Sequence, residues 1–199
     1  KGSATVRSSP QVAQPRRSLR NLSDQSLIKI VRRSGHWGKM DKLLKEIPMR
    51  WKGIVLHHSL TKDNQKTVDW KSIIRYHKEE RGWSDVGYHF GIELAHNGYR
   101  VHEGRPLSRR GAHVKELDFN GKFIGICILG NYDKGPVPKE AWTLAQSLVE
   151  VLQKKFGILQ ENVIGHREAQ RIAGLILDNR KSCPGNYFNT DIFRQGILS

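Results

Sequence analysis

The chain has 199 residues, of which 37% are hydrophobic and 27% are charged, and its formal net charge is +15 at pH 7. This length allows one well-buried domain with a short appendage and excludes two large domains, and the composition excludes a chain that is disordered throughout. No apolar run is long enough to cross a bilayer, so we expect no transmembrane segment. No signal-like apolar region follows Lys1, which leaves the route of export open.

The positive charge is concentrated at the front of the chain. Residues 1–50 hold 12 Lys or Arg against 3 Asp or Glu, a balance of +9, and the remainder holds 22 against 16, a balance of +6. Such an excess attracts polyanions, and it also keeps a protein soluble, so both explanations stay open. The chain lacks zinc-finger spacing, a helix-turn-helix signature and an interleaved aromatic platform. We therefore expect no specific nucleic-acid partner.

The front of the chain divides into two segments. Residues 1–20 mix Ser, Pro, Gln and Arg without apolar periodicity, which predicts a disordered basic arm or linker. Ser23 is a candidate N-cap, and apolar residues at helical spacing follow it until Pro48. Residues 21–49 are therefore predicted to form a small basic helical extension, and residues 50–199 to form the main domain.

The main domain is predicted to begin with a short buried strand at 54–56, because all three residues are apolar and two are β-branched. His57 stands at the end of this strand, where α/β sheets present functional groups. A helix is predicted from Thr67 to Gly82, because apolar residues recur there at positions i, i+3, i+4 and i+7.

Three further strand-like runs follow, at 88–93, 99–102 and 123–130. The turn signal His-Asn-Gly at 96–98 favours a hairpin between the first two runs. Antiparallel and parallel pairing are therefore expected in the same sheet. Cys127, inside the third run, is predicted to be a buried free thiol.

The last third of the chain is predicted to be helical apart from one strand. Pro138 and Gly157 bound a long segment with a continuous apolar face, which predicts a helix that covers the sheet. A short strand at 163–164 and a weak helical pattern at 191–198 complete the chain. The predicted fold class is α/β, a single domain with a mixed central β-sheet flanked by helices.

Two histidines and one cysteine follow predicted strands or lie in a turn. His57 ends the first strand, His166 follows the strand at 163–164, and Cys183 precedes a Pro-Gly turn. Two imidazoles and one thiolate suit zinc, and a set of three protein ligands leaves the open position of a catalytic site. The same spacing also fits surface histidines and a buried thiol, so it does not decide between these interpretations.

Seven motifs in order resemble one family. The chain resembles the zinc-dependent N-acetylmuramoyl-L-alanine amidases, the type that includes phage amidase lysozymes and animal peptidoglycan recognition proteins. The resemblance covers residues from about 50 to about 195 and rests on the following blocks: IVLHHS at 54–59, GWSDVGYHF at 82–90, GRP at 104–106, RGAH at 110–113, IGICILGNY at 124–132, GHRE at 165–168 and KSCPG at 181–185.

The resemblance implies a set of site residues. Zn²⁺ would be held by His57, His166 and Cys183. The oxyanion and the protons would be handled by Tyr88 and Lys181, a phenol and an ammonium that are both suitable donors. Glycan or stem peptide would be contacted by Arg105, His113, Asn131 and Tyr132. His58 receives no role, and the identity of the general base stays open.

The resemblance also implies an activity and a partner. The activity is hydrolysis, by zinc-activated water, of the amide between the lactyl group of N-acetylmuramic acid and L-alanine of the stem peptide. The alternative is a non-hydrolytic peptidoglycan-binding module, but such relatives lose the thiol ligand, and this chain retains Cys183 together with Tyr88. We expect a monomer that acts on the cell wall, whether secreted, periplasmic or phage-delivered. Its basic arm is expected to attach it to an anionic wall polymer.

Overall fold

The central sheet is organised around β1 (Gly53–His58), whose side chains are buried on both faces. The computed structural model describes residues 51–62 and 69–197, so the predicted arm and the predicted helical extension lie outside the described residues. β1 pairs in parallel with β4 (Phe123–Ile128) on one side and with β5 (Val163–Gly165) on the other. A strand that is central in a parallel arrangement is covered on both faces, which explains its continuous apolar run.

The other two strands form the predicted hairpin. β2 (Phe90–Ala95) pairs antiparallel with β3 (Gly98–Glu103) and parallel with β4. The sheet order is β3-β2-β4-β1-β5. The mixed sheet predicted from the sequence is therefore confirmed. It has five strands, and among them only β3 runs antiparallel to its neighbour.

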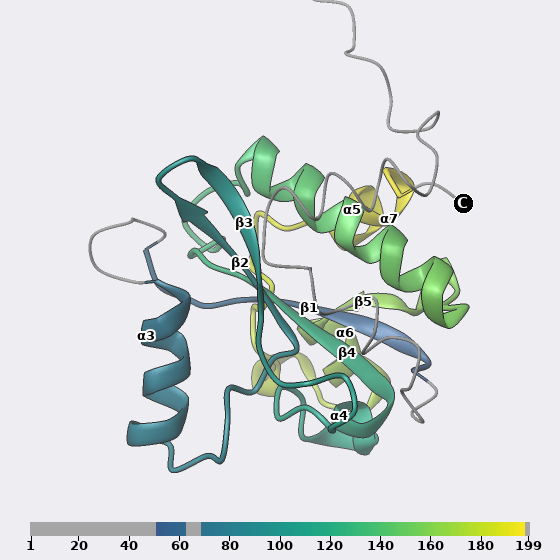
Figure 1. The fold of residues 1–199 in the computed structure, drawn as a ribbon. Helices are drawn as coiled ribbons and strands as arrows, with labels where there is room; N and C mark the ends of the chain where they lie inside the picture. The colour runs from purple at the N-terminus through teal and green to yellow at the C-terminus, as the bar shows by residue number, and fades with distance from the viewer. Residues whose placement is uncertain (1–50, 63–68, 198–199) are drawn as a thin grey trace, which may run out of the picture.

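Helices cover both faces of the sheet, as Figure 1 shows. α5 lies on one face, and α3 and α6 lie on the other side of the sheet. Among the described residues, no helix is both long and apolar enough to span a membrane. The α-helices are α3 (Trp70–Arg75), α4 (Phe119–Lys122), α5 (Lys139–Phe156), α6 (His166–Ile172) and α7 (Thr190–Gln195).

The two longest predicted helices agree with the structure to different degrees. The predicted helix at 67–82 is α3 followed by a π-helical turn, Tyr76–Glu80, closed by a bond from the amide of Arg81 to the carbonyl of Tyr76. By contrast, α5 begins after Pro138 and ends at Gly157, as predicted, because Gly157 adopts the left-handed φ of 65°.

The main core lies between the sheet and α5. Ile54 and Leu56 of β1 point to this side and pack with Leu148 of α5. Val55, on the opposite face, packs with Ile164 in a second cluster beside α6. Because side chains alternate along a strand, His57 lies on the same face as Val55, away from α5. The metal-ligand candidate is therefore separated by the sheet from the largest apolar cluster.

Candidate metal centre

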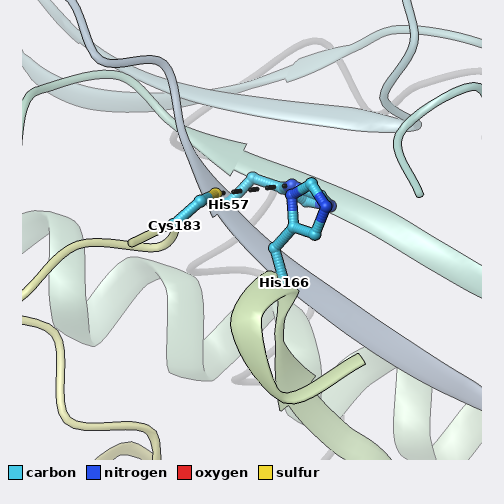
Figure 2. A group of neighbouring side chains, drawn as sticks. All are labelled: His57, His166 and Cys183. Carbon is cyan, nitrogen blue, oxygen red and sulfur yellow. Dashed lines mark hydrogen bonds between the residues drawn. The ribbon is translucent and has the colours of Figure 1, made fainter. Parts of the chain in front are cut away.

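Three side chains from separate elements converge beneath the end of β1. His57 comes from β1, His166 is the first residue of α6, and Cys183 lies in the loop before α7 (Figure 2). All three are buried, and their potential ligand atoms lie within 4.8 Å of one another. Nδ1 of His57 is 3.6 Å from Sγ of Cys183. The structure therefore brings together the three residues that the sequence predicted as ligands.

The loop that carries Cys183 is held by the residue after His166. The guanidinium of Arg167 donates hydrogen bonds to the carbonyls of Ser182, Gly185 and Phe188. The amide of Arg167 also donates to the carbonyl of Cys183, at 2.8 Å. One residue thus ties the start of α6 to the loop on both sides of the thiol. This role of Arg167 was not predicted from the sequence, although the residue lies inside the GHRE block.

The approach of this loop to the strand requires a glycine before His166. A Cβ atom at Gly165 would lie 2.7 Å from Cδ of Pro184, which is closer than such contacts occur. The amide of Gly165 also donates to the carboxylate of Glu168, at 2.6 Å, which caps the first turn of α6. The GHRE and SCPG segments are therefore packed directly against each other.

Burial decides the protonation of the three candidate ligands. It lowers the pKa of His57 well below the ordinary value and lowers the pKa of His166 to about 4. It raises the pKa of the Cys183 thiol to about 12. At neutral pH the site thus presents two neutral imidazoles, ready to donate a lone pair, and a thiol that a metal would have to deprotonate. This donor set fits zinc.

Tyr88 and Lys181 both lie at this centre. The ring centroid of Tyr88 is 5.1 Å from that of His57, and burial raises the pKa of the half-buried phenol well above its ordinary value. The side chain of Lys181 is exposed, and its charge contributes to the lowered pKa of His57 and of His166. Its backbone amide donates to Oε1 of Gln170, at 2.8 Å. The catalytic roles of both residues stay predictions.

The predicted substrate contacts occupy different environments. The buried guanidinium of Arg105 donates to the backbone carbonyls of Val86, Arg110 and Asp85, at 2.9, 3.0 and 3.2 Å. These bonds indicate that Arg105 holds loops together, and its contact with substrate stays a prediction.

Two further predicted contacts, Asn131 and Tyr132, are neighbours in the loop after β4. The hydroxyl of Tyr132 is buried and donates to the carbonyl of Leu129, at 2.6 Å. Asn131 is half-buried, and its side-chain oxygen accepts from the amide of Asp133, at 3.2 Å. The bond to Leu129 indicates a structural role for Tyr132, and the contacts of both residues with substrate stay predictions.

His113 lies inside the protein, beside the candidate ligand His57. It is 8% exposed, and its Nδ1 is 3.1 Å from Nε2 of His57. Cys127 is also buried on this face, as a free thiol, and it lies opposite His57 in the parallel register of β1 and β4. The sequence prediction of a buried free Cys127 is confirmed, whereas the position of His113 next to a ligand was not predicted.

The sheet and the convergent ligands define a class: a mixed α/β domain that carries two histidines and a cysteine at the end of its central parallel strands. The family model described as N-acetylmuramoyl-L-alanine amidase matches residues 47–186. This chain therefore belongs to the N-acetylmuramoyl-L-alanine amidase family.

Curated relatives match about half or more of the chain. Peptidoglycan recognition protein 1 of Bos taurus is 42% identical over 103 residues, which cover 51% of this chain and 52% of the relative. The N-acetylmuramoyl-L-alanine amidase of Homo sapiens is 30% identical over 121 residues, 60% of this chain and 19% of the relative. The chain thus spans about half the length of the recognition protein and a smaller part of the human amidase.

Solved structures share the fold. The amidase LysC from Clostridium intestinale URNW superimposes with a TM-score of 0.61 at 25% identity, covering 76% of this chain and 88% of LysC. A mutant of Drosophila PGRP-LB, in complex with tracheal cytotoxin, gives 0.60 at 26% identity, covering 77% and 86% of the two chains. The fold predicted from the sequence is thereby confirmed.

Proposed function

We propose that this protein is a zinc-dependent N-acetylmuramoyl-L-alanine amidase that hydrolyses the amide between the muramic acid lactyl group and L-alanine of peptidoglycan. The observation that carries the proposal is the convergence of His57, His166 and Cys183, with ligand atoms within 4.8 Å. Membership of the amidase family supports the bond type. Similarity to peptidoglycan recognition proteins supports the polymer as the partner.

The ligand set is suited to a catalytic rather than a structural metal. Structural zinc sites are usually closed by four protein ligands, whereas catalytic sites have three and keep one position for water or substrate. His57, His166 and Cys183 make a set of three within the described part of the chain. A zinc ion bound there would polarise a carbonyl and lower the pKa of water toward about 7.

The protein's own donors would act on the substrate carbonyl and the departing amine. The hydroxyl of Tyr88 is protonated at neutral pH, and burial raises its pKa still further, so it can donate a hydrogen bond to the carbonyl oxygen as negative charge develops there. Lys181 is exposed, and its side chain is free to approach a bound substrate. Its ammonium would stabilise the same oxygen or pass a proton to the amine.

The second candidate function is binding of peptidoglycan without cleavage, which the similarity to recognition proteins supports. A binding module needs a groove for the polymer but no metal. In this chain the thiol of Cys183 lies 3.6 Å from Nδ1 of His57, and the ring centroid of Tyr88 lies 5.1 Å from that of His57. These residues favour the hydrolase, since binding alone would not require them.

One experiment separates the two candidates. The zinc-loaded protein is incubated with defined muropeptides, and the products are identified by mass spectrometry. We expect release of the intact stem peptide with a free amino terminus on L-alanine, and loss of this product in the Cys183→Ser variant and with chelator. Binding of the muropeptides without any product would favour the binding module, and cleavage at another bond would indicate a different hydrolase.

A further inference from the structure

The buried imidazole of His113 is connected at both nitrogens. Its Nε2 lies 3.1 Å from the carbonyl oxygen of Phe123, and its Nδ1 lies 3.1 Å from Nε2 of His57. The rings of His57 and His113 are nearly perpendicular, with centroids 5.0 Å apart. Both ring nitrogens of His113 thus have partners inside the protein, and the glycan or peptide contact predicted from the sequence stays a prediction.

These bonds determine the positions of the protons. A carbonyl oxygen can only accept a hydrogen bond. Nε2 of His113 therefore carries a proton and donates a hydrogen bond to the carbonyl of Phe123. In the neutral ring Nδ1 of His113 is then an acceptor, and Nε2 of His57 must be the donor to it. His57 therefore carries its proton on Nε2, which leaves a lone pair on Nδ1, the atom that faces Sγ of Cys183.

The surroundings of His113 fix its ring in this orientation. A Cβ atom at Gly125 of β4 would lie 2.5 Å from Cδ2 of His113, and one at Gly111 would lie 2.4 Å from the same atom. Both positions therefore admit the ring only because they are glycine. The side-chain oxygen of Asn120 accepts hydrogen bonds from the amides of His113 and Val114, at 2.7 and 2.9 Å. The ring and the backbone of His113 are therefore both held in place.

We propose that His113 is a positioning residue that selects the Nε2-protonated tautomer of His57 and so directs the Nδ1 lone pair toward the metal. The inference rests on the proposed function for the identity of the ligands. A metal-ligating histidine generally donates its second N–H to a neighbour, most often a carboxylate or a carbonyl. Here the acceptor is another histidine, whose own orientation depends on Phe123 and on two glycines.

The first test uses the wild-type, zinc-free protein and needs no variant. Long-range ¹H–¹⁵N spectra distinguish protonated from unprotonated ring nitrogens. We expect a protonated Nε2 and an unprotonated Nδ1 for both His57 and His113. A His57 ring protonated on Nδ1 would overturn the proposal whatever the activity of the protein.

The second test measures zinc affinity by competition with a chromophoric chelator. The His113→Phe variant keeps a ring but loses both nitrogens, and we expect it to bind zinc about 10-fold to 100-fold more weakly, as is typical when a partner of a metal ligand is lost. His113→Asn places an amide oxygen close to the position of Nδ1, and we expect it to restore most of the affinity. Wild-type affinity in His113→Phe would contradict the proposal.

A control for the packing around His113 is provided by His89, a second buried histidine whose ring centroid lies 5.8 Å from that of His113 but whose ring nitrogens both bond to backbone. Its Nε2 lies 3.1 Å from the carbonyl of Arg109, and its Nδ1 accepts from the amide of Gly125. We expect His89→Phe to destabilise the fold and to leave the zinc affinity of the folded protein near that of wild type. If His113→Phe and His89→Phe lose the same zinc affinity, the loss comes from general destabilisation, and the proposed role of His113 is wrong.

The two proposals can fail separately. A wild-type protein with the expected tautomer and zinc affinity that releases no stem peptide would refute the amidase function and support the role of His113. A protein that cleaves muropeptides normally after His113→Phe, with unchanged zinc affinity, would support the amidase function and refute the role of His113.

Discussion

Tyr88 and Lys181 differ in how firmly the protein holds them. Tyr88 is half-buried beside the ring of His57, while Lys181 is exposed, and its backbone is anchored through Gln170. Lys181 lies only two residues before Cys183, so its backbone stays near the metal centre although its side chain can move. We therefore expect the half-buried hydroxyl of Tyr88 to be held more firmly than the exposed ammonium of Lys181.

We predict that Tyr88→Phe and Lys181→Ala each lower kcat by on the order of 100-fold to 1000-fold, because each removes a donor that acts mainly in the transition state. KM and zinc content should change little. The double variant should lose less than the product of the single losses if both donors serve one oxygen. Steady-state kinetics on a muropeptide, with metal analysis of each variant, test this. A variant with normal kcat and normal zinc content would remove that residue from the mechanism.

The protonation of the ligands gives a second prediction at this scale. The pKa of Cys183 is raised to about 12 and that of His166 is lowered to about 4, so at pH 7 only the thiol has a proton to lose. Zinc binding should therefore release about one proton per ion from the protein, and about half a proton more at pH 7 if a zinc-bound water has a pKa near 7. Calorimetric titration in buffers of different ionisation enthalpy measures this number. The Cys183→Ser variant should bind zinc more weakly. For the wild-type protein, release of two or more protons per zinc ion would mean that a histidine is charged before binding.

The helix α5 and the candidate metal centre lie on opposite faces of the sheet, so stability and chemistry are expected to be separable at the scale of elements. Leu148 is completely buried between α5 and the sheet. The ligands depend on β1, the start of α6 and the loop before α7, and none of these ligands is in the cluster around α5.

We predict that Leu148→Ala lowers the free energy of unfolding by about 2–5 kcal/mol, through lost burial and the cavity left behind. The matched control is Leu159→Ala, since Leu159 is 60% exposed, and its truncation should change stability by less than about 0.5 kcal/mol. Urea denaturation measures both. At a temperature where Leu148→Ala is folded, its kcat should equal that of wild type; a lower kcat would show that α5 packing is transmitted through the sheet to the site.

Across the whole molecule, buried neutral histidines make stability depend on pH. Burial lowers the pKa of His89 to about 4, and the side chain is 1% exposed. An unfolded chain, in which this pKa is near 6.5, binds the proton more readily, so stability is lost as pH falls from about 6.5 to about 4. Below about pH 4 both states are protonated, and this contribution stops changing.

We predict that His89 alone reduces the free energy of unfolding by on the order of 2–3 kcal/mol between pH 7 and pH 4. Urea denaturation with chelator at both pH values, combined with an NMR titration of the His89 ring, checks the prediction. A His89 ring that titrates near pH 6.5 in the folded protein would show that burial does not lower its pKa and that it contributes nothing to the pH dependence of stability.

The basic front of the chain gives a prediction about attachment. Residues 1–20 lie outside the described residues, and their Arg-rich composition predicts electrostatic binding to an anionic wall polymer. Deletion of these residues should leave kcat on soluble muropeptides unchanged and should weaken binding to intact walls most at low salt, where charge is least screened. Sedimentation with purified walls at two salt concentrations tests this. Unchanged wall binding would make the segment a linker.

The sequence by itself determined what depends on neighbours along the chain. The periodicity of α5 and its bounding Pro138 and Gly157 predicted that helix closely, and His-Asn-Gly predicted the hairpin of β2 and β3. Seven short blocks identified the family and named the three ligand candidates. Each of these signals is a short stretch of neighbouring residues, so local propensity and motif chemistry were sufficient to find it.

Only the tertiary structure decided which atoms face one another. His57 and Cys183 are 126 positions apart, and His57 and His113 are 56 apart, so no local pattern brings them together. The sequence predicted His113 in the RGAH block as a substrate contact, yet its ring packs against Gly125 and lies beside the candidate ligand His57. Hydrogen-bond partners and burial depend on close packing between distant segments. The proton that we propose on Nε2 of His57 therefore follows from the tertiary structure and from no local pattern.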